Sequence, residues 1–301
     1  MSLRAELMRL ALRKFVKGGA KPASTIEELR RGYEAIKRLI PNPPPGTVAT
    51  RVDAGGVSAV RVATAESRDD RHILYLHGGA YINGSPSHYR DFIWRLANAT
   101  KATVLCIDYR LAPEHPFPAA VEDAVAAYSW LGHNGADPRR TAIIGDSAGG
   151  GLTFATLLKL RDLKLALPSA AVTMSPWTDL TLTSLSFRNN AKADPMLNAA
   201  HAPQYVDWYL GGADPRDPYA SPIHGDAAGL PPSLILVGSD EILLDDAVRM
   251  AERLRAAGSR AELEIWPRMP HVWPLMARVV PEGRRAIARI GAFVQREMAA
   301  G

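Results

Sequence analysis

The feature that most restricts the fold of this 301-residue chain is the pentapeptide Gly145-Asp146-Ser147-Ala148-Gly149. A short β-branched run, residues 141–144, precedes it, and residues 152–158 after it can continue as a helix. Glycines permit a sharp strand-to-helix turn in which a larger side chain would clash. Such a turn exposes the serine hydroxyl and points free N–H groups of the following helix toward it. The pentapeptide alone also fits a glycine-rich turn without chemistry, so it needs support from the rest of the chain.

Apolar strand patterns alternate with amphipathic helix patterns along most of the sequence. The expected strands are residues 48–52, 57–62, 73–76, 102–107, 141–144, 170–174, 234–237 and 263–265. The expected helices between and after them are residues 119–131, 150–160, 246–257 and 284–298. The first two strands should form an antiparallel pair, and the others a mostly parallel sheet covered by helices on both faces. The fold class is therefore α/β, with right-handed crossovers.

Two segments depart from this alternation. Residues 1–40 predict two amphipathic helices, the second opened by a Thr25-x-x-Glu28 capping box. The apolar stripes of the two helices are Leu3, Leu7, Leu10 and Phe15, and Leu29, Tyr33, Ile36 and Ile40. Residues 177–225 are rich in aromatic residues, proline and glycine and are too long for an ordinary connection, so we interpret them as part of a lid.

The composition excludes several classes of protein. Cys106 is the only cysteine, which rules out an internal disulfide and a cysteine-rich metal site. No apolar run approaches the roughly 18 residues that a membrane-spanning helix needs. Residues 1–17 carry charges throughout and lack the apolar core of a signal peptide. We therefore expect a cytoplasmic protein with no stable membrane insertion.

The net charge of +5 is concentrated at the N-terminus, where residues 1–40 hold ten Lys or Arg and four Asp or Glu side chains. A solvated helix face is the simpler interpretation of this basic segment. Contact with a membrane surface or an anionic partner is the alternative. No nucleic-acid-binding motif is present, so nucleic acid is not an expected partner.

A second segment of small residues, His77-Gly78-Gly79-Ala80, follows the strand at 73–76. Small residues let backbone N–H groups converge on a ligand oxygen, as the developing negative charge of an acyl-transfer reaction requires. We predict an oxyanion hole made by the N–H groups of Gly78, Gly79 and Ala148. His77 should brace the loop, because no second metal ligand neighbours it at useful spacing, and no metal site is predicted.

A serine nucleophile needs a base, and the base needs an acid to hold its tautomer. His271 follows the strand at 263–265, so its loop should emerge at the same sheet edge as Ser147. Asp240 and Glu241 follow the strand at 234–237 and are both candidates for the acid. Asp245 and Asp246, a few residues on, fit the start of a helix better, where they would satisfy free N–H groups and the helix dipole. The order serine, acid, histidine is that of α/β-hydrolases.

Three long motifs stand in the order that is typical of the hormone-sensitive-lipase-like family, the bacterial family IV esterases. They are HGGAY at residues 77–81, DYRLAPEHPFPAA at 108–120 and GDSAGG at 145–150. The chain resembles this family from about residue 45 to residue 275. The resemblance implies an α/β-hydrolase fold with a helical cap, and hydrolysis of short-acyl carboxylic esters through an acyl-enzyme without metal or cofactor. Amide or peptide hydrolysis, or acyl transfer, is the alternative on the same triad. A non-catalytic binding protein is less compatible with the presence of His271.

The chain departs from the family pattern at two places. Ala80 stands where a third glycine is usual. The family's acid motif, D-P-L-x-D-[DE], aligns with Leu243, Asp245 and Asp246, which puts Glu241 at the acid position and Ile242 where proline is usual. We therefore favour Glu241 over Asp240 as the triad acid.

The resemblance also implies a domain organisation. Cap helices should occupy residues 1–45, the catalytic domain residues 46–176 and 221–301, and the cap insertion residues 177–220. Asp146 should orient the nucleophile turn. The side chains expected near the substrate, a small ester, are Ala80, Tyr81, Asp146, Trp208 and Leu210. A homodimer formed through the last strand, at 263–265, is a further expectation.

Overall fold

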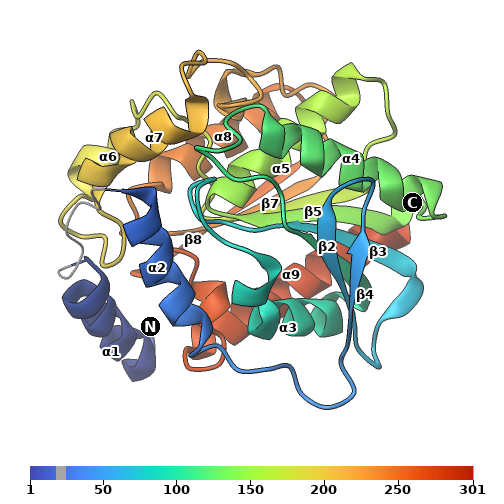
Figure 1. Ribbon diagram of the computed structural model, residues 1–301, viewed down its shortest axis with the longest axis horizontal. Helices are drawn as coiled ribbons and strands as arrows, with labels where there is room; N and C mark the ends of the chain where they lie inside the picture. Colours follow the sequence, from blue (N-terminus) through green and yellow to red (C-terminus); the bar gives the residue numbers. More distant parts are fainter. Residues whose placement is uncertain (18–24, 301) are drawn as a thin grey trace.

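The protein is built around one eight-stranded sheet in the order β1-β2-β4-β3-β5-β6-β7-β8 (Figure 1). The structure is a computed structural model that describes residues 1–17 and 25–300. The strands are β1 Val48–Asp53, β2 Ser58–Ala63, β3 Arg68–Leu76, β4 Ala102–Ile107, β5 Thr141–Asp146, β6 Ala170–Met174, β7 Ser233–Gly238 and β8 Ala261–Trp266. The β1–β2 and β2–β4 pairs are antiparallel, and all other pairs are parallel. The predicted α/β fold class, with its mostly parallel sheet, is confirmed.

Helices cover both faces of the sheet because successive strand side chains point to opposite sides. In β3, Leu74 and Leu76 pack into one core cluster, while Ile73 and Tyr75 pack into the other. The first cluster lies under α4 Ala119–His133, α5 Ala148–Asp162 and α8 Leu244–Ala256, and the second under α3 Arg90–Thr100 and α9 Pro281–Ala300. The sequence analysis did not predict α3. Its N-cap residue, Tyr89, makes no side-chain cap hydrogen bond, so the sequence lacks the usual N-cap signal, and Asp91 in the first turn is the only start signal there.

Two further groups of helices lie at the carboxyl edge of the parallel strands (Figure 1). The N-terminal group consists of α1 Leu3–Ala11, which continues as a π-helix over Leu12–Lys17, and α2 Ile26–Lys37. The second group follows β6 and contains α6 Ser186–Asn189 and α7 Ala202–Leu210. Residues 18–24 of the expected N-terminal cap lie outside the described residues. Within the described ranges, no helix has the length and apolar character needed to cross a membrane.

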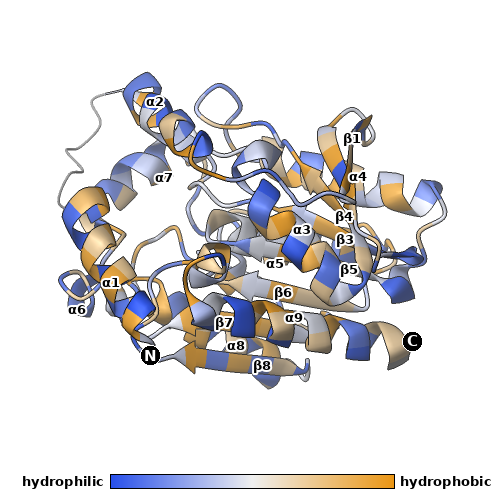
Figure 2. Cartoon of the chain, turned by 90° about the horizontal axis from the view of Figure 1, so that it is seen from below, coloured by the Kyte–Doolittle hydropathy of each residue, from blue (hydrophilic) through white to orange (hydrophobic). Residues whose placement is uncertain are grey.

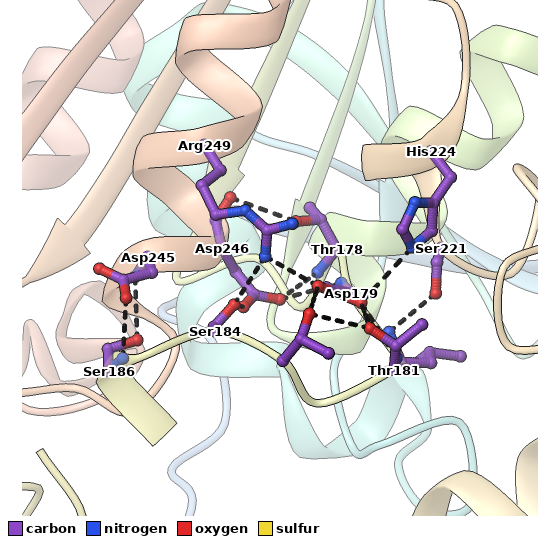
Figure 3. A network of polar contacts seen from close by, with 12 residues as sticks. Thr178, Asp179, Thr181, Ser184, Ser186, Ser221, His224, Asp245, Asp246 and Arg249 are labelled. Carbon is purple, nitrogen blue, oxygen red and sulfur yellow. Dashed lines mark hydrogen bonds and ion pairs between the residues drawn. The ribbon is translucent and has the colours of Figure 1, made fainter. Parts of the chain in front are cut away.

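A buried polar network joins the segment after β6 to the start of α8 (Figure 3). The Asp246 carboxylate accepts hydrogen bonds from the N–H groups of Thr178 and Asp179, at 2.9 Å each, and from the Ser184 hydroxyl at 2.6 Å. Asp245 accepts one from the Ser186 N–H at 2.7 Å. Both carboxylates lie in the first turn of α8, as expected, but the prediction that they satisfy N–H groups of their own helix is wrong. The backbone that they hold belongs to the segment after β6.

The buried Asp246 makes the stability of this junction dependent on pH. Burial raises the pKa of Asp246 from 3.8 to about 7 in the folded protein. The folded state therefore binds this proton more tightly than the unfolded chain does. The protonated carboxyl contributes its full stabilisation below the unfolded pKa, and this contribution is lost as the pH rises through the folded pKa of about 7. Asp246→Asn removes the titration and keeps the shape. Between about pH 5 and about pH 8, the melting temperature of the variant should improve relative to that of the wild type.

The control for this experiment is Asp69→Asn, which changes an exposed carboxylate. Its melting temperature should differ from that of the wild type by a constant amount over the same pH range. A constant difference for Asp246→Asn as well would contradict the assignment.

The strand β8 forms one edge of the described sheet, with β7 as its only neighbour there. Ile265 on this strand is 46 % exposed. An unpaired edge with an exposed apolar side chain is suited to pairing with a second copy. We expect the wild type to give a dimer mass in light scattering and Ile265→Lys to give a monomer mass. A monomer mass for the wild type over a wide concentration range would rule the dimer out.

Candidate active site

Ser147 lies at a strained turn between β5 and α5. Its backbone angles are φ 54° and ψ −122°, a conformation that non-glycine residues rarely adopt. The turn is so tight that a Cβ at Gly145 would come within 2.1 Å of the Gly149 carbonyl oxygen. Glycine is therefore required at position 145, and the turn holds the Ser147 hydroxyl away from the strand.

Loops that follow two other strands bring a histidine and a carboxylate to this hydroxyl. His271, in the loop after β8, places its Nε2 2.9 Å from the Ser147 Oγ. Its Nδ1 lies 2.7 Å from Oε2 of Glu241, in the loop after β7. Glu241 and His271 are both buried. Three residues that the sequence analysis singled out thus form one continuous hydrogen-bonded line.

The second oxygen of Glu241 is also fixed. Its Oε1 accepts hydrogen bonds from the Gly238 N–H at 2.6 Å and from the Ser175 hydroxyl at 2.7 Å. The Ser175 hydroxyl in turn accepts one from the Val272 N–H at 3.1 Å, next to His271. The sequence analysis missed Ser175. Its place directly after β6, at the same sheet edge, was the available signal.

The neighbouring carboxylate, Asp240, points the other way. Its Oδ2 lies 2.7 Å from Nη2 of Arg9 in α1, and its Oδ1 accepts a hydrogen bond from the Ser239 hydroxyl. The structure therefore brings Glu241, and not Asp240, to His271. Of the two candidates left by the sequence, only Glu241 has the geometry of a partner for the histidine.

A further buried carboxylate, Asp194, contacts the loop that carries Asp240 and Glu241. It accepts hydrogen bonds from the N–H of Ile242 at 3.0 Å and from those of Met196 and Leu197 at 2.8 Å each. It thus joins the loop that carries Glu241 to the segment between β6 and β7. No motif marked Asp194 in the sequence, because its role depends on a contact between residues 48 positions apart.

Two opposing effects set the pKa of His271. Burial alone lowers it, but the hydrogen bond and charge of Glu241, with the charges of Asp194 and Asp146, raise it above its ordinary value. The imidazolium form of His271 is therefore favoured by three carboxylates.

The loop at residues 77–80 lies on the other side of Ser147, and one prediction for it is wrong. The N–H of Gly78 donates to Oδ1 of Asp146 at 2.9 Å, so it is not available to a ligand oxygen. In the described part of the chain, the N–H groups of Gly79, Ala80 and Ala148 have no acceptor. The free donors are thus displaced by one residue from the predicted set, because Gly78 faces the carboxylate beside Ser147.

Asp146 is buried and holds this loop through several donors. Besides the Gly78 N–H, it accepts hydrogen bonds from the hydroxyls of Tyr75 at 2.6 Å and Tyr89 at 3.2 Å. Burial raises the pKa of Asp146 to about 6, although these donors and His271 act in the opposite direction. The adjacent His77 stacks on Tyr109 with ring centroids 4.2 Å apart, and burial lowers the pKa of His77 to about 4. It is therefore a neutral side chain packed behind the loop.

A mostly apolar cavity of about 390 Å³ opens onto Ser147 and His271. Its walls come from the N-terminal helices, from the 77–83 loop and from the segment between β6 and β7; they include Val16, Leu29, Tyr33, Ala80, Trp177, Phe187, Leu197 and Tyr205. No group of three or more His, Cys, Asp or Glu side chains in the described ranges is arranged to hold a metal ion.

The predicted substrate contacts divide into two sets. Ala80 and Asp146 line the cavity. Tyr81 instead stacks on Tyr209, with ring centroids 3.7 Å apart, and Leu210 is buried in the core. Trp208 stacks on Tyr205, which lies one turn earlier in α7. None of these three residues lines the cavity, so the structure does not support their predicted contact with substrate. On α7, the first turn and its N-cap His201 face the cavity, while Trp208 and Leu210 in the later turns pack against the core, as Tyr81 does from the 77–83 loop.

Removing the charge of Asp194 should lower the pKa of His271. Asp194→Asn takes away a buried negative charge that favours the imidazolium. The pKa is measured by NMR titration of the imidazole ring. Asp240→Asn is the control, because the Asp240 charge is paired with Arg9. An unchanged pKa for Asp194→Asn, or equal shifts in the two variants, would contradict this view of the site.

Comparison with known proteins agrees with this fold. A family model described as alpha/beta hydrolase fold matches residues 73–275. An acetyl-hydrolase of Streptomyces hygroscopicus is 46% identical over 272 residues, which cover 90% of each chain. An esterase of Acinetobacter venetianus is 36% identical over 267 residues, which cover 88% of this chain and 87% of the relative. A solved esterase of the bacterial hormone-sensitive lipase family superposes with a TM-score of 0.94 at 44% identity, covering 99% of each chain.

The fold and the arrangement around Ser147 thus define an α/β-hydrolase. Within this class, the chain belongs to the bacterial hormone-sensitive-lipase family of esterases, and it is a serine carboxylic-ester hydrolase.

Proposed function

We propose that the chain hydrolyses carboxylic esters with short acyl chains through a Ser147–His271–Glu241 triad and an acyl-enzyme intermediate. The observation that carries this proposal is the line of contacts from the Ser147 Oγ through both nitrogens of His271 to Glu241, at the cavity wall. Such a line is the arrangement that activates a serine hydroxyl at neutral pH.

In the first half of the reaction, Ser147 Oγ attacks the ester carbonyl carbon while His271 Nε2 takes its proton. Glu241 stabilises the resulting imidazolium through Nδ1. The N–H groups of Gly79, Ala80 and Ala148 stabilise the negative charge on the carbonyl oxygen. The tetrahedral intermediate then collapses, His271 gives its proton to the leaving alkoxide, and the acyl group remains on Ser147.

In the second half, a water molecule takes the place of the alcohol. His271 accepts its proton as the oxygen attacks the acyl carbon, and then returns the proton to Ser147 Oγ as the acid leaves. The same three N–H groups serve both halves, because the charge develops on the same oxygen.

Asp146 acts here as a positioning residue. Its carboxylate binds the N–H of Gly78 and so fixes the loop in which the next two N–H groups, among the described residues, have no protein acceptor. Tyr75 and Tyr89 hold the carboxylate in turn. Ala80 can replace the usual third glycine because a methyl group leaves its N–H accessible; its φ of 55° is the strained conformation that this geometry demands.

The preference for short acyl chains rests on the cavity and on one relative. The cavity of about 390 Å³ is enclosed by cap side chains on several sides and must hold both the acyl and the alcohol groups. The relative from Streptomyces hygroscopicus, at 46% identity, is named an acetyl-hydrolase. Both favour a small acyl group over a long one.

Hydrolysis of p-nitrophenyl esters from acetate to palmitate tests the proposal. Activity should be highest for the short esters. Ser147→Ala should lower kcat by about four to six orders of magnitude, and Glu241→Ala by about four. Asp240→Ala, the matched control on the same loop, should stay within about tenfold of the wild type.

Three results would contradict the proposal: full activity of Ser147→Ala, an equal loss for Asp240→Ala and Glu241→Ala, or a maximum at palmitate. Turnover of amides in preference to esters would assign the same residues to amide hydrolysis.

A further inference from the structure

The first helix of the chain exposes its apolar face. Leu3, Leu7 and Leu10 lie on one stripe of α1 and are 77%, 57% and 57% exposed. The buried face consists instead of Ala5, Arg9 and, just beyond the helix, Leu12. The sequence analysis identified the leucine stripe, and a helix that packs on a core normally buries such a stripe. Figure 2 shows α1 at the margin of the molecule.

Specific polar contacts hold the helix in this orientation. The guanidinium of Arg9, only 7% exposed as a residue, donates to the carbonyl of Arg268 and to Asp240, at 2.7 Å each. At the start of the helix, the N–H and hydroxyl of Ser2 donate to Glu282 at 2.6 and 2.8 Å. Burying an arginine costs free energy unless it is paired in this way. These contacts fix the leucines on the outside.

Exposed basic residues flank the stripe. Arg4 and Lys14 are exposed, and the exposed apolar side chains continue to Phe15, at 72%. Glu6 is the only acidic residue among positions 1–17, and it pairs with Arg268 at 3.0 Å. The surface therefore combines a leucine stripe with unneutralised positive charge, the composition of helices that lie flat in a lipid–water interface.

We propose that this segment, residues 1–17, docks on an anionic lipid surface, with Leu3, Leu7 and Leu10 in the boundary between headgroups and acyl chains. Arg4 and Lys14 meet the anionic headgroups. A second copy of the chain is a poorer partner, because a two-fold contact brings together two copies of a surface with the same net positive charge.

The position of the segment connects docking with the site. Val16, at the end of the segment, lines the cavity that contains Ser147, as do Leu275 and Met276. A docked molecule therefore holds its cavity beside the lipid–water boundary, where apolar esters concentrate. This consequence, unlike the docking itself, depends on the proposed function.

Vesicle flotation tests the docking. Wild-type protein should float with vesicles of phosphatidylcholine mixed with phosphatidylglycerol, and much less with phosphatidylcholine alone or at high salt. The triple variant Leu3→Ser, Leu7→Ser, Leu10→Ser should bind the anionic vesicles about tenfold more weakly or worse. Arg4→Glu with Lys14→Glu should lose the preference for anionic lipid. Leu163→Ser with Leu165→Ser is the matched control, since both side chains are exposed leucines outside this segment, and it should bind as the wild type does.

Failure of the wild type to bind anionic vesicles at low salt would overturn the proposal. Equal binding by the triple serine variant would do the same. A third result would also overturn it: the wild type binds no vesicles and is a dimer by light scattering, while the triple serine variant is a monomer. The leucine stripe would then be a contact between two copies of the chain. Flotation needs no turnover, so its failure is distinguishable from failure of the proposed function.

Discussion

The hydrogen bond between the buried carboxylate of Glu241 and His271 is the interaction on which the rest of the structure depends. A carboxylate without access to water is tolerated only when donors surround it. Glu241 obtains them from His271 in the loop after β8, from Ser175 directly after β6, and from the backbone of Gly238, the last residue of β7. Three adjacent strands must therefore end in register for the charge to be buried at all. The parallel sheet is what brings these ends to one edge, and Ser147, after β5, lies on the same edge.

The N-terminal helices and the segment between β6 and β7 are joined to this arrangement through polar contacts as well as apolar packing. Asp194 and Asn190, both between β6 and β7, bind the backbone of Ile242 and Glu241. Arg9 binds Asp240, on the other side of the same short loop. The loop that carries Glu241 is thus held by the sheet, by α1 and by the segment between β6 and β7. The environment of His271 consequently depends on residues that line or support the cavity.

Much of this could be predicted from the sequence, because the informative patterns are local. The strand runs and the turn around Ser147 indicated the sheet, and the loop positions after the strands indicated His271 and the pair Asp240 and Glu241. The features that could not be predicted depend on the direction in which a backbone or side-chain group points in the folded protein. The choice between Gly78 and Ala80 rests on where each N–H points. Trp208 and Leu210 were misplaced because helical phase relative to a cavity is a tertiary property. The outward face of α1 was missed for a related reason, since a buried arginine overrides the leucine pattern.

The contacts of Arg9 have a kinetic consequence. The same guanidinium binds Asp240, next to Glu241, and the carbonyl of Arg268, three residues before His271. If α1 swung outward as a rigid lid, it would withdraw this bridge from both loops and leave the Asp240 carboxylate uncompensated. Such a movement would therefore carry the cost of unpairing an arginine that is buried in the closed arrangement. Side-chain movements at the cavity mouth with α1 in place avoid this cost, so the contacts of Arg9 favour them as the route by which small molecules enter and leave.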